Sequence, residues 1–234
     1  MFKLIKLEWK RNRWRAYHIT VVISTLFQLG LLYLYAAIPY MDNNSDSVLF
    51  KSYHFIVGLA CVVSTAIFMI LSSVIASKII IEEYAGKKAI LLFSYPVERK
   101  KIFDAKVFLV FVYTLLGMIV SNFFCVGIFF ITEGLFPMCQ EPLTAEIILV
   151  SLLSIDCYAL IATLSGIVSF WFGFLKKSVA GTIVAACILA VCICQMMGIT
   201  LFSKGVMAGI TAVLFIAALM AWINLRHRVE EMEV

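Results

Sequence analysis

The chain has 234 residues, of which 63% are hydrophobic and only 14% charged, and its mean hydropathy is +1.03. A soluble globular domain does not need so much apolar surface, so the composition predicts a polytopic membrane protein. The formal net charge of +5 does not indicate a nucleic-acid-binding protein, because the Lys and Arg residues lie beside the ends of apolar runs.

Residues 1–17 are predicted to form an amphipathic helix that lies in the membrane interface. Lys3, Lys6 and Lys10 recur at helical spacing on one face, and Trp9 lies on the other face, where it suits the headgroup level. The alternative is a simple positively charged anchor.

Six apolar runs are long enough to cross the bilayer as helices. Their predicted ranges are 18–38, 54–77, 102–131, 146–172, 179–201 and 206–225. We expect Pro39 to end the first helix. We expect the second helix to continue beyond the membrane through Tyr84, with Gly86 as its end. The sequence shows no internal repeat, which predicts a single transmembrane domain over residues 1–234.

Charge counting predicts that both termini face the cytoplasm. With that orientation, seventeen of the nineteen Lys and Arg residues fall on inner segments, and only Lys51 and Lys204 fall on outer ones. This is a strong positive-inside bias, and it holds at every loop.

The segment 78–106 is the only long charged stretch between apolar runs, and it contains the apolar tetrad Ile90–Phe93 between Gly86 and Pro96. A soluble loop ordinarily avoids such a run. Either the tetrad tucks under its own spans at headgroup level, or it forms a short helix that docks in a groove on a cytosolic partner.

Catalytic chemistry is not supported by the motifs. The P-loop pattern GxxxxGK[ST] does not occur, so the chain cannot hydrolyse ATP by that route. Glu82 and Glu83 do not match an EExxxR intramembrane protease, because position 87 is Lys; we expect both carboxylates on a solvated helix extension. Seven cysteines without a CxxC pair predict neither a disulfide framework nor a metal site.

Asp156 is predicted to lie near the middle of the fourth span, where a carboxylate costs on the order of 3 kcal/mol. Gln28, Asn122 and Gln195 are possible partners on other spans. The residue contributes either to a transport pathway, with Gln28 and Asn122, or to structural contacts between helices.

The string EEYAGKKAILLFSYPVERKKIFDAK resembles the central cytoplasmic loop of ABC transporter permeases of the type-2 exporter class. The matching features are the acidic helix end Glu83-Tyr84, a short Leu-rich coupling helix at Ala89–Phe93, a Ser-x-Pro-x-x-Arg step at Ser94–Arg99, and a Lys-rich entry to the next span. The sequence departs from the commoner pattern at Ala85-Gly86-Lys87. The layout of a basic start and six spans is also similar over the whole chain.

The resemblance implies an all-α permease with an N-terminal elbow helix and a coupling segment that contacts a separate cytosolic ABC ATPase. The residues implied to couple to the ATPase are Glu82, Glu83, Tyr84, Lys87, Lys88, Ile90, Leu91, Leu92, Phe93 and Arg99. It further implies a second permease copy, identical or related, and no cofactor in this chain, with ATP and Mg bound by the ATPase. The location implied is a bacterial plasma membrane.

Small permeases of this kind resemble exporters of amphipathic peptides, such as bacteriocins, lantibiotics and phenol-soluble modulins of Gram-positive bacteria. Short acidic outer loops suit the export of such a peptide. The alternatives are a peptide-immunity or sensing subunit and an exporter of drugs or small lipophiles. A self-contained channel or intramembrane enzyme is a more remote alternative, because it would need converging charged or ligating residues.

Overall fold

The computed structural model describes residues 2–41, 49–84, 99–139, 141–176, 178–201 and 203–230, and the regular structure in this part of the chain is helical. The elements in chain order are α1 (Phe2–Arg11), α2 (Arg15–Met41), α3 (Tyr53–Ala76), the π-helical turn η2 (Ser77–Ile81), α4 (Glu82–Tyr84), α6 (Arg99–Leu135), α7 (Ala145–Leu175), α8 (Val179–Thr200) and α9 (Lys204–Glu230). Within these described ranges, six helices are long and apolar enough to cross a membrane, which confirms the predicted all-α, six-span fold class.

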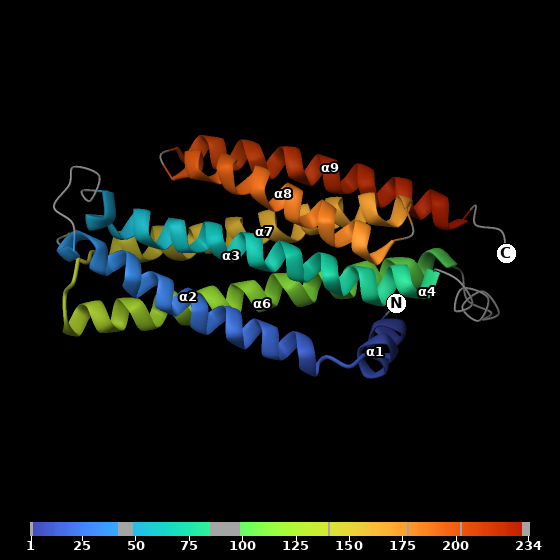
Figure 1. Cartoon of the computed structure of the whole chain (residues 1–234), viewed down its shortest axis with the longest axis horizontal. Helices are drawn as coiled ribbons and strands as arrows, with labels where there is room; N and C mark the ends of the chain where they lie inside the picture. Colours follow the sequence, from blue (N-terminus) through green and yellow to red (C-terminus); the bar gives the residue numbers. More distant parts are fainter. Residues whose placement is uncertain are drawn as a thin grey trace.

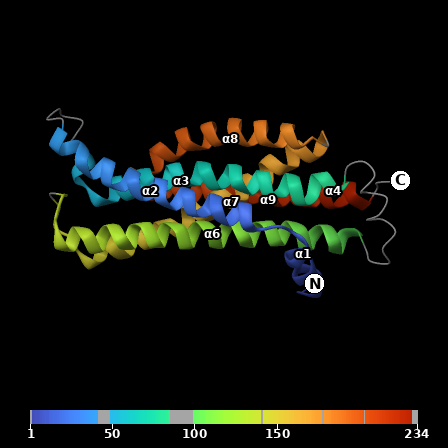
Figure 2. The same ribbon diagram turned by 60° about the horizontal axis from the view of Figure 1, so that its bottom comes forward.

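The six long helices lie side by side, so that the bundle has two distinct ends (Figure 1). One end contains α1, α4, the beginning of α6 and the C-terminal end of α9, and we call it the basic end. The opposite end contains the connection between α6 and α7, residues 136–144, which holds Glu141 and no Lys or Arg; we call it the acidic end. Figure 2 shows that α1 lies beside the bundle rather than inside it.

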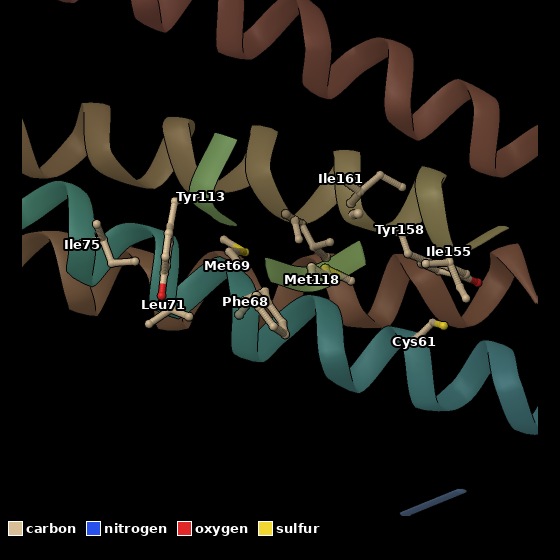
Figure 3. Close-up of a cluster of buried hydrophobic side chains, with 14 of the residues drawn as sticks. Cys61, Phe68, Met69, Leu71, Ile75, Tyr113, Met118, Ile155, Tyr158 and Ile161 are labelled. Atoms are coloured by element: carbon tan, nitrogen blue, oxygen red, sulfur yellow. The ribbon is translucent and has the colours of Figure 1, made fainter. Parts of the chain in front are cut away.

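Helix α3 is the centre of the bundle, since 67% of its membrane window is buried, against 11% for the peripheral helix α9. Its side chains Phe68 and Met69 pack in a core that includes Met118 of α6 and Ile161 of α7 (Figure 3). Small residues bring the backbones together, because a Cβ atom on Gly166 of α7 would lie 2.5 Å from the Ser72 Oγ atom of α3. Such close approach replaces the hydrophobic driving force that is missing between helices in lipid.

Two predicted helix ends were wrong. Helix α1 ends at Arg11 rather than continuing to residue 17, because the side chain of Asn12 donates to the Glu8 carbonyl at 3.0 Å and terminates it. Helix α2 continues through Pro39 to Met41. Pro39 lies in the last turn, so only two residues of helix, Tyr40 and Met41, follow the hydrogen bond that its missing N–H removes.

The second span continues past the predicted membrane boundary to Tyr84, as expected, but it does so through the π-helical turn η2, which the sequence did not predict. Helix α6 then begins at Arg99. The predicted coupling helix, with Lys87, Lys88 and the tetrad Ile90–Phe93, lies outside the described residues.

Candidate functional site

A buried lysine lies at the basic end, where the chain leaves α4 and re-enters at α6. Lys106 is 0% exposed. Its ammonium pairs with the Glu83 carboxylate and donates to the Ile79 carbonyl at 3.2 Å. The acceptor carbonyl belongs to η2, and π-helical turns of this kind frequently occur at functional sites. Two helix ends flank residues 85–98: α4 before them and the beginning of α6, up to Lys106, after them. We call these two helix ends the stems. The contacts of Lys106 therefore join one stem to the other.

The N-terminal helix contributes two more charges to the same place. Arg11 pairs with Glu83 and lies 2.7 Å from Glu8 on its own helix. The Glu8 carboxylate is also 3.9 Å from the Lys106 ammonium. We call Glu8, Arg11, Glu83 and Lys106 the four-charge network. It contains two carboxylates and two cations, and it ties α1 to both stems. Removing the fully buried member, Lys106, would leave Glu83 and Glu8 without their buried cation, which typically costs about 3–5 kcal/mol, whereas the ion pairs of the half-exposed Arg11 contribute less.

Burial disfavours the charged form of Glu8. Burial raises the pKa of the Glu8 carboxyl above its ordinary value of 4.5, although the neighbouring Lys106 and Arg11 cations act in the opposite direction. Desolvation of Glu8 thus outweighs its ion pairs, which makes Glu83 the more important carboxylate of the network.

Aromatic side chains pack beside the four-charge network. The Tyr84 ring lies 6.1 Å from Phe103 of α6 and 6.0 Å from Phe174 of α7, and it is only 4% exposed. The Lys106 ammonium is 5.9 Å from the centroid of the same Tyr84 ring. The end of α4 is therefore held against α6 and α7 by packing as well as by charge.

A second aromatic group fixes the turn between α1 and α2. The Trp14 indole N–H donates to the Trp9 carbonyl at 2.8 Å, and the two rings stack at 4.5 Å. Tyr113 of α6 packs on both rings, and its hydroxyl is 3.1 Å from the His18 Nδ1 atom. Because α1 is anchored to α6 at this point as well as through Lys106, a displacement of α6 would carry α1 with it.

The structure changes the prediction for the two adjacent glutamates. Glu82 is exposed, as expected for a solvated helix extension, but the Glu83 side chain is only 18% exposed and pairs with Lys106 and Arg11. The role of Lys106 was missed. The sequence does contain an indication of this role. Lys106 lies deeper in the apolar run than the basic residues before it, and a lysine at such a position requires a carboxylate partner.

The three predicted pathway residues do not come together. Asp156 lies on the exposed face of α7, whereas Gln28 of α2 and Asn122 of α6 are buried in the bundle. The Asn122 side chain accepts a hydrogen bond from Ser64 of α3 at 3.0 Å. No hydrogen bond within the described ranges joins Asp156 to Gln28 or Asn122.

At the acidic end, a buried carboxylate is held by neutral donors. Glu133 is 3% exposed and accepts from the Tyr53 hydroxyl at 3.0 Å, the Met138 amide at 2.9 Å and the Cys139 amide at 3.1 Å. Glu141 accepts from the Tyr53 amide at 3.1 Å. These contacts close the connection between α6 and α7 over the beginning of α3.

Neither polar site has the composition of a metal centre. Among the residues that the structure describes, no group of three or more His, Cys, Asp and Glu side chains is placed to hold a metal ion. The four-charge network pairs charges between three separate segments, so what it can do is transmit a displacement of one segment to the others.

The sequence of this chain is similar to that of known proteins. Residues 4–147, more than half of the chain, match the family described as ABC-2 family transporter protein. The chain is also 25% identical over 190 residues to the uncharacterized protein YcbO of Bacillus subtilis (strain 168), covering 81% of this chain and 82% of that relative. No solved structure matches. The chain therefore belongs to the ABC-2 transporter family, and it is a multi-pass permease subunit of an ABC transporter.

Proposed function

We propose that this permease exports amphipathic peptides of the antimicrobial or cytolytic kind from a bacterial cell. Its family implies a partner ABC ATPase. In this proposal that separate subunit binds ATP and Mg, and the chain itself needs no cofactor. The basic end faces the cytoplasm, as the distribution of Lys and Arg favours, and two permease copies, identical or related, complete the transporter.

The observation that carries the mechanism is the burial of Lys106 between Glu83 and Glu8. In the proposed mechanism, residues 85–98 contact the ATPase, and Glu82, Lys87, Lys88 and Arg99 lie at or beside this contact. Closure of the ATPase pushes on both stems at once.

The displacement then reaches the membrane part in two ways. Tyr84 packs on Phe103 and Phe174, so the end of the central helix α3 moves together with α6 and α7. Arg11 pairs with Glu83, so the same displacement moves α1. Packed helices shift between discrete arrangements rather than deforming continuously, which turns this small displacement into a switch.

The acidic end favours a cationic or amphipathic cargo. The carboxylate of Glu146 is exposed in the first turn of α7 and is available to attract such a peptide, whereas that of Glu133 is engaged by three donors. Asp156 faces outward from α7 near the expected midplane. Since a carboxylate is unfavourable against lipid there, we assign it to the transport path between the two copies.

Gln28 and Asn122 are further candidates for the path. Each is buried, and in the part of the chain that the structure describes each has an amide nitrogen without a hydrogen-bond partner. These donors are available to new acceptors when α2, α3 and α6 shift during the transport cycle.

The proposal is tested by reconstituting the permease with its ATPase in inside-out vesicles. We expect ATP-driven uptake of a fluorescent cationic amphipathic peptide, and we expect Asp156→Asn to reduce that uptake without reducing expression. Uptake of a neutral lipophilic dye in place of the peptide would overturn the peptide assignment and favour an exporter of small lipophiles. Binding of the peptide without uptake would favour a sensing or immunity role.

Docking of the coupling segment has a separate test. Leu91→Glu combined with Leu92→Glu places two carboxylates in the apolar tetrad of residues 90–93. We expect this double variant to insert in the membrane but to lose the ATPase during co-purification. Retention of the ATPase at the wild-type level would contradict docking through this segment.

A further inference from the structure

A cavity of about 580 Å³ lies between α6, α7 and α9 at the basic end of the bundle. Its walls are almost entirely apolar, and three of them are partly exposed: Phe108 at 53%, Phe215 at 54% and Leu219 at 41%. In a membrane, exposed apolar walls on the long helices face the hydrocarbon. A molecule that fills this cavity therefore enters from the lipid leaflet.

The mouth of the cavity is polar. The Trp222 indole N–H donates to one oxygen of Asp104 at 3.1 Å. The Arg226 Nε atom lies 3.6 Å from the other oxygen, which is an ion pair but too long for a hydrogen bond. The Arg226 guanidinium carbon lies 5.3 Å from the centroid of the Trp222 ring. Asp104 thus holds both neighbours in place.

Arg226 has unused hydrogen-bonding capacity at this mouth. Its Nε atom is buried and has no hydrogen-bond partner among the described residues, while its side chain as a whole is 43% exposed. None of the hydrogen bonds between residues in the described part of the chain is donated by its guanidinium group. Arginine offers five donors in a planar fork that matches a phosphate group. The hydrogen-bond donors that remain available at the mouth therefore belong to a cation, the Arg226 guanidinium.

The surrounding charges have the same sign. Lys100 and Lys101 precede Asp104 by one helical turn on α6. Basic sites between transmembrane helices on the cytoplasmic side are suited to anionic lipid headgroups. A cationic amphiphile would instead meet Arg226 and these lysines, and would have to displace Arg226 from Asp104.

We propose that this cavity binds an anionic phospholipid of the cytoplasmic leaflet. Its phosphate takes the free donors of Arg226, and an acyl chain lies in the cavity against Phe108, Phe215 and Leu219. This site goes beyond the exported cargo and does not depend on its identity. The bound lipid would join α9 to the beginning of α6, directly after the coupling segment.

Native mass spectrometry of the purified, delipidated permease tests the proposal with two added lipids, dioleoyl-phosphatidylglycerol and dioleoyl-phosphatidylcholine. We expect preferential binding of phosphatidylglycerol, and Arg226→Gln should weaken it about tenfold. The matched control is Arg228→Gln, since Arg228 is exposed and already donates to Asn224 at 3.3 Å; it should bind as the wild type does. Equal binding of the two lipids, or equal losses in the two variants, would overturn the site.

A second variant keeps the test decisive if Arg226→Gln fails to fold. Leu219→Trp leaves all charges in place but fills the cavity from its partly exposed wall. We expect it to lower phosphatidylglycerol binding several-fold while the circular dichroism spectrum stays helical. Unchanged binding in this variant would mean that the lipid does not occupy the cavity.

Discussion

The two ends of the bundle hold their buried charges differently. At the basic end, the buried Lys106 ammonium pairs with carboxylates from two other segments. At the acidic end, the buried Glu133 carboxylate accepts hydrogen bonds from uncharged donors. The Lys106 ammonium pairs with Glu83 of α4 and Glu8 of α1, so the free energy of these ion pairs changes whenever α1 or α4 moves. Glu133 receives two of its three hydrogen bonds from amides five and six residues later. We infer that the basic end is built to connect moving segments and the acidic end to close a loop.

The largest expected effect is that of Lys106→Met, which removes the buried cation and leaves two carboxylates near each other. We expect the Tm of the purified permease to fall by on the order of 10 °C. The control is Lys10→Met at an exposed position of α1, at the same end of the bundle, which should leave the Tm nearly unchanged. Similar Tm values for the two variants would show that Lys106 does not hold the basic end together.

The closed loop at the acidic end predicts an unreactive thiol. Burial, reinforced by the Glu133 and Glu141 carboxylates, raises the pKa of the Cys139 thiol to about 12 from an ordinary value of 9.0. Because the thiolate is the nucleophile, maleimide should modify Cys139 at pH 7.5 roughly a thousandfold more slowly than it modifies a short cysteine peptide. Peptide mapping by mass spectrometry gives the rate, with SDS-unfolded permease as the control. Labelling at the peptide rate would mean that the loop is open.

A neutral substitution at the acidic end should be tolerated far better than one at the basic end. Glu133→Gln keeps a carbonyl oxygen for the Tyr53 hydroxyl and loses only the extra strength of charged hydrogen bonds. We expect a Tm decrease of about 3 °C in thermal unfolding of the purified permease. A loss as large as that of Lys106→Met would remove the distinction between the two ends.

The smallest expected effect is that of Glu8→Gln. Because the pKa of Glu8 is raised above its unfolded value of 4.5, folding favours the protonated form. Its contribution to stability is present below pH 4.5 and is lost as the pH rises through the raised pKa. The glutamine variant does not titrate there, so its Tm relative to wild type should rise with pH over this window and be at least equal at pH 7. A relative Tm that falls with increasing pH would contradict the account of Glu8.

The sequence predicted the fold well, because the bilayer imposes strong and simple constraints. Apolar runs of membrane length specified all six long helices, and basic residues beside Tyr84 and Arg99 marked the segment that joins two of them. The helix ends were less predictable. At Asn12 the end depends on one local hydrogen bond, and α2 continues past Pro39 to Met41; hydropathy predicts neither feature.

The candidate site was only partly predictable. The pattern Glu83-Tyr84 identified the right stem, but periodicity cannot show that Lys106, twenty-three residues later, reaches the same carboxylate. The contribution of α1 through Arg11 depends on the turn at Trp14, which is a tertiary feature. The outward orientation of Asp156 also depends on how α7 packs, which one sequence does not specify.

Hydrogen–deuterium exchange of the permease–ATPase complex, with and without a non-hydrolysable ATP analogue, tests most directly whether the four-charge network transmits the state of the ATPase. The variant is the neutral pair Lys106→Met with Glu83→Gln, which leaves no uncompensated buried charge at their contact. In the wild type, nucleotide should change the protection of α1 as well as that of the stems around Tyr84. In the paired variant the change should persist in the stems and become smaller in α1, which stays in contact with α6 through the packing of Trp9 on Tyr113. The account would be contradicted if nucleotide changed the protection of α1 equally in the wild type and in the paired variant.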